Sequence, residues 1–498
     1  KGLRVIGMAG SDDKVEYVKQ LGADVAINYK TCGNYSDAIK KAAPDGIDIY
    51  FDNVGGELLD AALANMKNYA RVVICGAMSQ YNNASPSHSY GVKTTPNILT
   101  RRAVVAGFII LDHLNTSVHE QFFDEISQLY REGKITYKID ETNGFENAPQ
   151  VLLDQFRGKN FGKSIDYVPA GEPSIDDFVF EQVPKPTKDQ LQPDQVIIKS
   201  LYLSVDPYMR GRMTGSKDSY VDSFTKGDVI TNFSVAEVTS SASSEYKEGD
   251  LVLVDNGKWQ TEYIVNAKDI SKVPARDGIS PKDYLGVLSM PAFTAYYGTV
   301  VIGKPKAGET ILVSSASGAV GQMVVQIAKA KGLRVIGMAG SDDKVEYVKQ
   351  LGADVAINYK TCGNYFEVIK KAAPDGIDIY FDNVGGELLD AAMSNIKDHA
   401  RIVICGAITQ YNLSSPSEVY RIKSMTNVLV RKATITGFII LEHLHTSDHK
   451  QFFEEFSQLY KDGKIKYRIH ETQGFDNAPQ ALLDLFSGKN FGKSVVKV

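Results

Sequence analysis

The sequence has few of the side chains that bind metals or form disulfides. Its 498 residues include 8 histidines and 4 cysteines, and residues 169–398 contain one cysteine, Cys362, and no histidine. Zinc sites are built from Cys, His and acidic ligands. The scarcity therefore argues against a metal site and against a metal-assisted alcohol oxidation. The cysteines are far apart and form no CxxC pair, which is typical of a reducing compartment.

Long apolar runs are also missing. No stretch approaches the roughly 18 apolar residues of a membrane span, and no signal peptide opens the chain. The net charge of −5 gives no electrostatic reason to expect nucleic acid or a membrane as a partner. We therefore expect a cytoplasmic protein that acts on a small molecule. The length predicts about two to four domains.

An internal repeat organises the chain. Lys1–Tyr35 is identical to Lys331–Tyr365, and the segment Gly158–Lys163 returns as Gly488–Lys493, at the same offset of 330 residues. The first copy therefore ends near Val168, and a nearly complete unit follows it. We interpret the chain as a partial tandem duplication. It has no initiator Met, and we expect either a fragment of a longer tandem protein or the product of a gene-model error.

Residues 311–331 open a predicted nucleotide-binding unit. Ile311–Val313 is a short apolar run typical of a buried strand, Ser314–Gly321 is a turn of small residues, and Met323–Ala330 has helical spacing. Such a turn lets backbone N–H groups approach a pyrophosphate at the start of a helix. The full G-x-G-x-x-G pattern is absent, so a generic strand-to-helix turn is the alternative.

The end of the next predicted strand indicates which dinucleotide is bound. An NAD site would place an acidic residue there, roughly 20 residues past the first glycine. The sequence instead has Ala339 and Gly340, followed by Ser341 and Lys344. A hydroxyl and an ammonium suit a 2′-phosphate, which favours NADPH. The alternative is that Lys344 is an ordinary solvated helix charge.

The first copy begins at this second strand, so it lacks the central strand and the phosphate loop. Without them its remaining strands lose a neighbour in a doubly wound sheet. We predict that residues 1–168 do not bind a dinucleotide as an independent site.

The fold class predicted is α/β. A doubly wound parallel (Rossmann) sheet is indicated by strands that alternate with helices, at 354–360, 377–382, 400–405 and 433–440. A β-rich, partly closed barrel (GroES-like) domain is indicated by short strands at 195–205, 251–254 and 262–265. Residues 165–168 are either the last strand of the first copy or the first strand of the second. The predicted domains are 1–125 (partial nucleotide-binding), 126–168 (end of the first barrel), 169–290 (β-rich substrate domain), 291–455 (nucleotide-binding) and 456–498 (return to the substrate domain).

Hydride transfer without a metal needs an acceptor that delocalises charge by itself, as a conjugated enal or enone does. Hydride adds to the β-carbon and the charge moves to the carbonyl oxygen, where a tyrosine hydroxyl can stabilise it. Tyr208, Tyr263, Tyr297 and Tyr411 are candidates. With 26 tyrosines in the chain, a packing role is the alternative for each.

The segment Leu203–Met213, LSVDPYMRGRM, resembles the signature of the zinc-independent medium-chain dehydrogenase/reductases that include prostaglandin reductase and alkenal double-bond reductase. Further matches are Met290–Gly298, Ser315–Gly321, Phe381–Gly386, Cys405–Ile408 and Gly488–Lys493. The resemblance covers residues 174–498. Residues 1–168 resemble the C-terminal half of the proteins of this family. It implies an NADPH-dependent enal or enone reductase. A quinone reductase of the same superfamily, or a non-enzymatic NADPH-binding tandem protein, are the alternatives.

The resemblance also implies roles for individual residues. Tyr411 would help to hold the enolate oxygen and Tyr208 would line the substrate mouth. The cofactor-binding residues would be Gly318, Ala319, Val320, Gly321, Ser341, Lys344, Tyr359, Asn383, Cys405, Gly406 and Asn490. Proteins similar to this family dimerise through their last strands, which occur here twice, at Ala103–Ile110 and Ala433–Ile440. A homodimer or an intramolecular pseudo-dimer is therefore expected.

Overall fold

The computed structural model describes residues 2–80, 90–109, 185–213, 223–224, 229–273, 278–413, 415–444 and 446–498, together with Glu125, Gln128, Glu132, Pro173 and Phe178. The chain divides into two compact units. The first unit comprises residues 1–167 and 420–435, and the second comprises residues 168–419 and 436–498. The predicted domain boundaries stay predictions.

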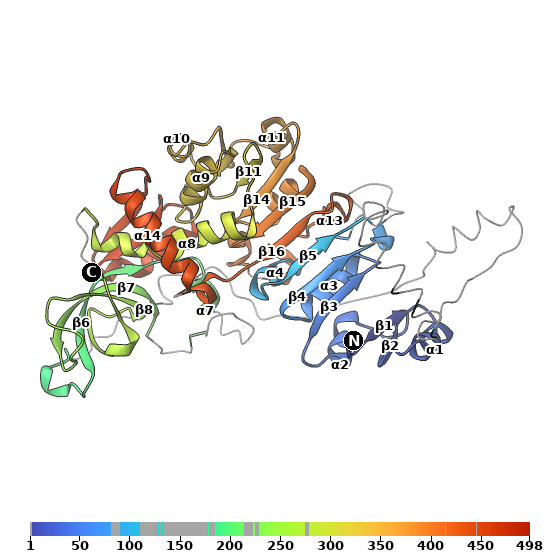
Figure 1. Ribbon diagram of the computed structural model, residues 1–498, viewed down its shortest axis with the longest axis horizontal. Coiled ribbons are helices and arrows are strands. Elements are labelled where there is room, and N and C mark those ends of the chain that lie inside the picture. The colour runs from blue at the N-terminus through green and yellow to red at the C-terminus, as the bar shows by residue number, and fades with distance from the viewer. Residues whose placement is uncertain are drawn as a thin grey trace, which may run out of the picture. The chain divides into compact units, whose positions relative to one another are not determined.

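The second unit contains a parallel sheet in the order 3-2-1-4-5 that the alternating pattern predicts. The strands, in spatial order, are β13 (Val355–Asn358), β12 (Arg334–Ala339), β11 (Thr310–Val313), β14 (Ile377–Asp382) and β15 (Ile396–Ile404). The helices between them are α9 (Gly321–Ala330), α10 (Asp342–Gln350), α11 (Tyr365–Ala372) and α12 (Gly386–Met393) (Figure 1). All four residues of β11 are buried, because this strand has a neighbour on each side and apolar side chains on both faces.

The β-rich part of the second unit forms a mixed sheet around one long strand, β6 (Gln195–Ser204). The sheet order is β10-β8-β7-β6-β18-β17, and β9 also pairs with β6. The bounds are β7 (Thr231–Ser241), β8 (Leu251–Lys258), β9 (Glu262–Asn266), β10 (Ser271–Lys272), β17 (Ile469–Gln473) and β18 (Lys493–Lys497). Helices α7 (Met209–Arg212), α8 (Met290–Tyr296), α14 (Ser447–Lys461) and α15 (Ala478–Phe486) complete the unit.

The first unit contains two separate sets of strands (Figure 1). Among the described residues β1 (Ile6–Ala9) pairs only with β2 (Val25–Asn28), whereas β3 (Ile47–Asp52), β4 (Met66–Ile74) and β5 (Val104–Gly107) pair in that order. The helices are α1 (Asp12–Gln20), α2 (Tyr35–Ala42), α3 (Gly56–Ala64) and α4 (Pro96–Thr100). Within this unit α13 (Thr426–Val430) contacts β5, and the Gly107 N–H donates to the Ala433 carbonyl at 3.1 Å.

Some predicted elements differ in extent. The last strand, expected over 433–440, is β16 (Thr434–Gly437), and Ile440–His443 is a 3-10 turn. β15 begins at Ile396, four residues before the predicted strand. The strand expected at 165–168, and most of the predicted segment 126–168, lie outside the described residues.

Candidate active site

The glycine loop between β11 and α9 leaves no room for a side chain at its last position. A Cβ at Gly321 would lie 2.2 Å from the Ser315 carbonyl oxygen, so the helix can start this close to the strand only with glycine there. Ser315 itself adopts φ 50°. Among the described residues, the backbone N–H groups of Ala319 and Val320 have no hydrogen-bond partner. The loop therefore presents free donors at the N-terminus of a ten-residue helix, a favourable place for a phosphate.

Asn383 ties this loop to the next strand of the sheet. Its backbone N–H donates to the Ser314 hydroxyl and its side-chain amide donates to the Ser314 carbonyl, both at 2.8 Å. Asp382 accepts from the N–H groups of Val384 and Gly385, each at 2.9 Å. The carboxyl ends of β11 and β14 are thereby held together, at the edge where open parallel sheets bind their ligands.

A cavity of about 970 Å³, including the open solvent at its mouth, lies at this edge within the second unit. Its walls are mostly apolar, with Met290, Pro291 and residues 438–441 on them. Nine of the thirteen predicted site residues line it. They are Tyr208, Gly318, Ala319, Val320, Gly321, Asn383, Cys405, Gly406 and Tyr411.

The Tyr411 hydroxyl offers the cavity a side-chain donor whose hydrogen is not engaged by the described residues. Its oxygen accepts from the Ala407 N–H at 3.3 Å. Burial raises the pKa of Tyr411 to about 12, and the nearby Cys405 and Asp382 act in the same direction. At neutral pH the hydroxyl is therefore protonated and able to donate.

The Tyr208 hydroxyl is held differently. It donates to the Asn232 side-chain oxygen at 2.5 Å. The orientation of this amide follows from its other contacts, because its nitrogen donates to the Ser204 carbonyl at 3.0 Å and to Asp206 Oδ2 at 3.1 Å. Burial, and then the charge of Asp206, raise the pKa of Tyr208. Its hydrogen is thus committed, and it can offer a ligand only its oxygen lone pairs or its ring.

A buried ion pair is connected to Tyr208 through the Asn232 side chain. Lys493 is fully buried, and its Nζ lies 2.7 Å from Asp206 Oδ1 and 2.8 Å from the Val205 carbonyl oxygen. Burial lowers the pKa of Lys493, and the Asp206 charge opposes this. Sequence reasoning missed Asn232, Asp206 and Lys493 as site residues. Asp206 and Lys493 stand inside motifs already quoted, whereas nothing in the sequence around Asn232 marks it.

Four predicted cofactor residues do not line the cavity: Ser341, Lys344, Tyr359 and Asn490. Ser341 is the residue before the first turn of α10, and its hydroxyl donates to the Asp343 carboxylate and not to the helix backbone. Lys344 Nζ donates to the Gly488 carbonyl at 2.7 Å, and burial lowers its pKa. Lys344 therefore links α10 to the segment that carries Asn490.

The other two residues of this group lie close to backbone. The Asn490 side-chain amide donates to the Gly492 carbonyl at 3.0 Å, and Gly492 bridges to Gly318 of the loop. A Cβ on Gly340 would come within 2.7 Å of the Tyr359 hydroxyl. Their predicted contacts with the adenosine side and the nicotinamide end of a cofactor stay predictions.

Two further candidates, Tyr263 and Tyr297, take structural roles. The Tyr263 hydroxyl accepts from the Lys258 N–H at 3.0 Å, and the Tyr297 ring stacks on His443 with centroids 4.2 Å apart. Neither lines the cavity. Burial raises the pKa of the Cys405 thiol to about 12, so it is no thiolate nucleophile at neutral pH.

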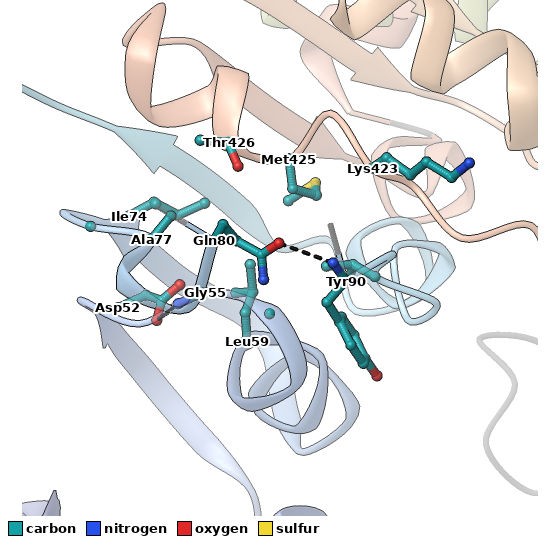
Figure 2. A pocket seen from close by; sticks show the side chains of 13 residues that line it. Asp52, Gly55, Leu59, Ile74, Ala77, Gln80, Tyr90, Lys423, Met425 and Thr426 are labelled. Atoms are coloured by element: carbon teal, nitrogen blue, oxygen red, sulfur yellow. Dashed lines mark hydrogen bonds between the residues drawn. The ribbon is translucent and has the colours of Figure 1, made fainter. Parts of the chain in front are cut away.

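A smaller pocket of about 330 Å³ lies in the first unit and holds none of the predicted site residues. Asp52, Gly55 and Leu59 line it together with Met425 and Thr426 (Figure 2). The Gln80 side-chain oxygen accepts from the Tyr90 N–H at 2.9 Å across one side of it.

No group of three metal-ligating side chains occurs among the described residues. Among the same residues, no helix is long and apolar enough to span a membrane.

Comparison with known proteins identifies the family. The profile of the zinc-binding dehydrogenases matches residues 1–128 and again 319–458, and the N-terminal domain of oxidoreductase matches residues 164–273. The chain belongs to the zinc-binding dehydrogenase family. It is therefore an oxidoreductase, and the two matches of one profile bear out the duplication. The side chains present do not fit a zinc site, because residues 169–398 contain no His and only one Cys.

Individual relatives are similar over most of their own length. The chain is 40% identical to 2-alkenal reductase (NADP(+)-dependent) of Nicotiana tabacum and 40% identical to prostaglandin reductase 1 of Bos taurus. Each alignment covers 66% of this chain, and 94% and 95% of the relative, respectively. The crystal structure of CurA from Vibrio vulnificus in complex with NADPH superimposes with a TM-score of 0.62 at 39% identity, covering 66% of this chain and 96% of CurA. The predicted family and fold class are confirmed.

Proposed function

We propose that the second unit reduces the carbon–carbon double bond of α,β-unsaturated aldehydes or ketones with NADPH and without a metal. The observation that carries this proposal is the convergence of nine predicted residues on one largely apolar cavity. An apolar wall with few polar groups suits a carbon skeleton that carries one carbonyl. The relatives that are named for alkenal and prostaglandin reduction support the same substrate class.

The cavity fits NADPH. Gly321 lets α9 start against the Ser315 carbonyl, where a Cβ would collide, and the free N–H groups of Ala319 and Val320 suit a pyrophosphate. Ser341 and Lys344 would hold the 2′-phosphate, and Tyr359 would lie on the adenosine side. Asn383, Cys405, Gly406 and Asn490 would hold the rest of the molecule. When bound, NADPH supplies a hydride.

Tyr411 would stabilise the oxygen of the substrate. Its hydroxyl is protonated at neutral pH and its hydrogen is free, so it can donate to the carbonyl oxygen as negative charge builds there. The Ala407 N–H orients the phenol oxygen from the other side. Because the same donor serves the ground state more weakly than the enolate, it lowers the barrier.

Tyr208 would shape the mouth of the cavity. Its hydrogen is committed to Asn232, so we assign it a contact with the substrate carbon skeleton and no proton transfer. The proton that completes the α-carbon then comes from solvent at the open mouth, and Tyr411 keeps its own proton.

The test is the loss of NADPH absorbance with a panel of enals, enones, quinones and simple alcohols. We expect turnover with enals and enones, and a fall of about 10- to 1000-fold in kcat for Tyr411→Phe. The matched control is Tyr81→Phe, the same position in the first copy, which should leave kcat unchanged. Turnover with quinones alone would support the quinone reductase instead, and no turnover with either class would support a binding protein.

A further inference from the structure

Two glutamines of α9 hold the segment that leads into β17. The Gln322 side-chain oxygen accepts from the Arg468 N–H at 2.8 Å, and its nitrogen donates to the Arg468 carbonyl at 3.1 Å. One turn further along the helix, Gln326 exchanges the same two bonds with Lys466, both at 2.8 Å. The backbone of residues 466–468 is therefore fixed against the helix that begins at the glycine loop.

The glycine loop itself also contacts this segment and the strand beside it. The Tyr467 hydroxyl donates to the Ala319 carbonyl at 3.3 Å, and Gly492 forms a β-bridge with Gly318. Gly492 lies so close to the segment that a Cβ there would come within 2.1 Å of the Arg468 carbonyl oxygen. Arg468 is thus anchored at the edge of the proposed cofactor site by contacts that do not involve its side chain.

The Arg468 side chain lies over an aromatic ring. Its guanidinium carbon is 3.7 Å from the centre of the Phe491 ring, and this half-buried ring is in edge contact with Tyr347, with centroids 5.3 Å apart. In the described part of the chain no group accepts a hydrogen bond from the guanidinium. A guanidinium held over a ring in this way keeps its N–H groups free at its edges, and their planar fork suits a phosphate.

Lys344 approaches the same ring. Its Nζ is 5.9 Å from the centre of the Phe491 ring, and it donates to the Gly488 carbonyl at 2.7 Å. An ammonium has three N–H donors, so two of them remain for a ligand. Burial lowers the pKa of Lys344, the Asp343 charge opposes this, and the Lys360 charge adds to it. An anion bound here would therefore stabilise the charged form of Lys344.

The carboxylates beside Lys344 are engaged with other groups. Asp343 accepts from the Ser341 hydroxyl, and Asp342 accepts from the Asn358 side-chain amide at 2.8 Å. Among the residues that the structure describes, neither the Lys344 ammonium nor the guanidinium over Phe491 forms an ion pair. The two cations thus have unused donors and no carboxylate partner, an arrangement that an anionic ligand would complete.

We propose that Arg468 is a further binding residue for the 2′-phosphate of NADPH, together with Lys344, and that the Phe491 ring holds its guanidinium in place. The proposal rests on the proposed function, because it assigns a further residue to the cofactor of that reaction. A phosphate monoester has about two negative charges and three acceptor oxygens, so it can accept from an ammonium and a guanidinium at once. Arg468 then adds affinity for NADPH over NADH and takes no part in hydride transfer.

Arg468→Met tests this on the full chain by isothermal titration with NADPH and with NADH, in the absence of substrate. Methionine keeps an apolar side chain on the Phe491 ring, and the bonds to Gln322 belong to the backbone, so the variant should fold. We expect Kd for NADPH to rise by about 10-fold and Kd for NADH to stay within about two-fold. kcat at saturating NADPH should be unchanged.

The matched control is Lys138→Met, at the same position of the first copy, which should leave both Kd values unchanged. Phe491→Leu keeps both cations but removes the ring, and should raise Kd for NADPH by a smaller factor of about three-fold. An equal rise of Kd for NADPH and NADH in Arg468→Met, or no rise for either, would overturn the proposal.

Failure of the proposed function has a different signature. A parent chain that binds NADPH but reduces neither enals nor enones would contradict the proposed reaction, while the titrations of Arg468→Met would still decide the role of Arg468. A parent chain that binds no NADPH would overturn both proposals.

Discussion

The two copies place the same residues in different surroundings. Helix α10 and helix α1 have the identical sequence DDKVEYVKQ, yet Val348 of α10 is fully buried and α1 has no buried residue. The strands beside them behave alike, since β12 is buried over most of its length and β1 is only half-buried. Burial in this sheet therefore depends on the central strand and its following helix, and not on the local sequence of the strands they cover.

We expect the same difference to separate the two copies in function. The second unit has the loop of Gly318–Gly321 and a cavity of about 970 Å³ beside it. The first copy starts after this loop, and the pocket in its unit is smaller and made of other residues. Substitutions at matched positions can therefore show whether activity belongs to the second copy alone.

The largest effect is expected at the loop. Gly321→Val would bring a Cβ within 2.2 Å of the Ser315 carbonyl, so the loop must move. We expect kcat/KM for NADPH to fall by at least about 100-fold, because small displacements at a binding site have effects of this size. Steady-state kinetics measure this, with circular dichroism to show that the chain is folded. Unchanged kcat/KM would mean that the loop does not hold the cofactor.

A large effect on stability is expected at the buried ion pair. Lys493→Met leaves Asp206 buried without its partner, which should lower the free energy of unfolding by about 3–5 kcal/mol. Urea denaturation measures the change. The matched variant Lys163→Met should cost less than about 1 kcal/mol, since residues 1–168 contain no counterpart of Asp206.

The double variant Asp206→Asn/Lys493→Met sharpens this test, because it removes both charges and should recover part of the loss. A loss as large for Lys163→Met as for Lys493→Met would contradict the asymmetry of the two copies.

A moderate effect is expected at the 2′-phosphate. Lys344→Ala should raise KM for NADPH by about 10-fold, which corresponds to about 1.4 kcal/mol of lost charge-assisted binding. The KM for NADH should hardly change. Lys14, the counterpart in α1, provides the control, and Lys14→Ala should leave both values unchanged. A parallel rise of KM for NADH would show that Lys344 acts on the fold of the site instead.

The smallest effect is expected from alkaline pH. The pKa of Tyr411 is raised to about 12 from the ordinary value of 10.0, so the unfolded chain releases this proton at a lower pH than the folded chain. The corresponding stability is fully present below pH 10 and is lost as pH rises toward about 12. Thermal unfolding of Tyr411→Phe should therefore lose less stability over this range than the parent. If the stability of Tyr411→Phe and of the parent depended on pH in the same way, the Tyr411 hydroxyl would be exposed to solvent in the folded chain.

Much of this organisation could be predicted from sequence. The run Ile311–Val313 and the small-residue turn after it indicated the central strand and the loop, because parallel strands are buried on both faces. The end of β16 could not be predicted, because Ile439 and Ile440 continue the apolar run although the strand stops at Gly437.

The site was predicted less completely than the sheet. Nine predicted residues, eight of them in quoted motifs, converge on the cavity, but the different states of the Tyr411 and Tyr208 hydroxyls depend on Ala407 and Asn232. These contacts join residues up to 24 positions apart. No local pattern in a single sequence reveals them.

The number of NADPH molecules bound by one chain tests the central claim most directly. Isothermal titration of the full chain with NADPH should give one site per chain, and Gly321→Val should abolish it, because the loop and the cavity occur in the second unit alone among the described residues. Two sites per chain, or one site that survives Gly321→Val, would contradict the account.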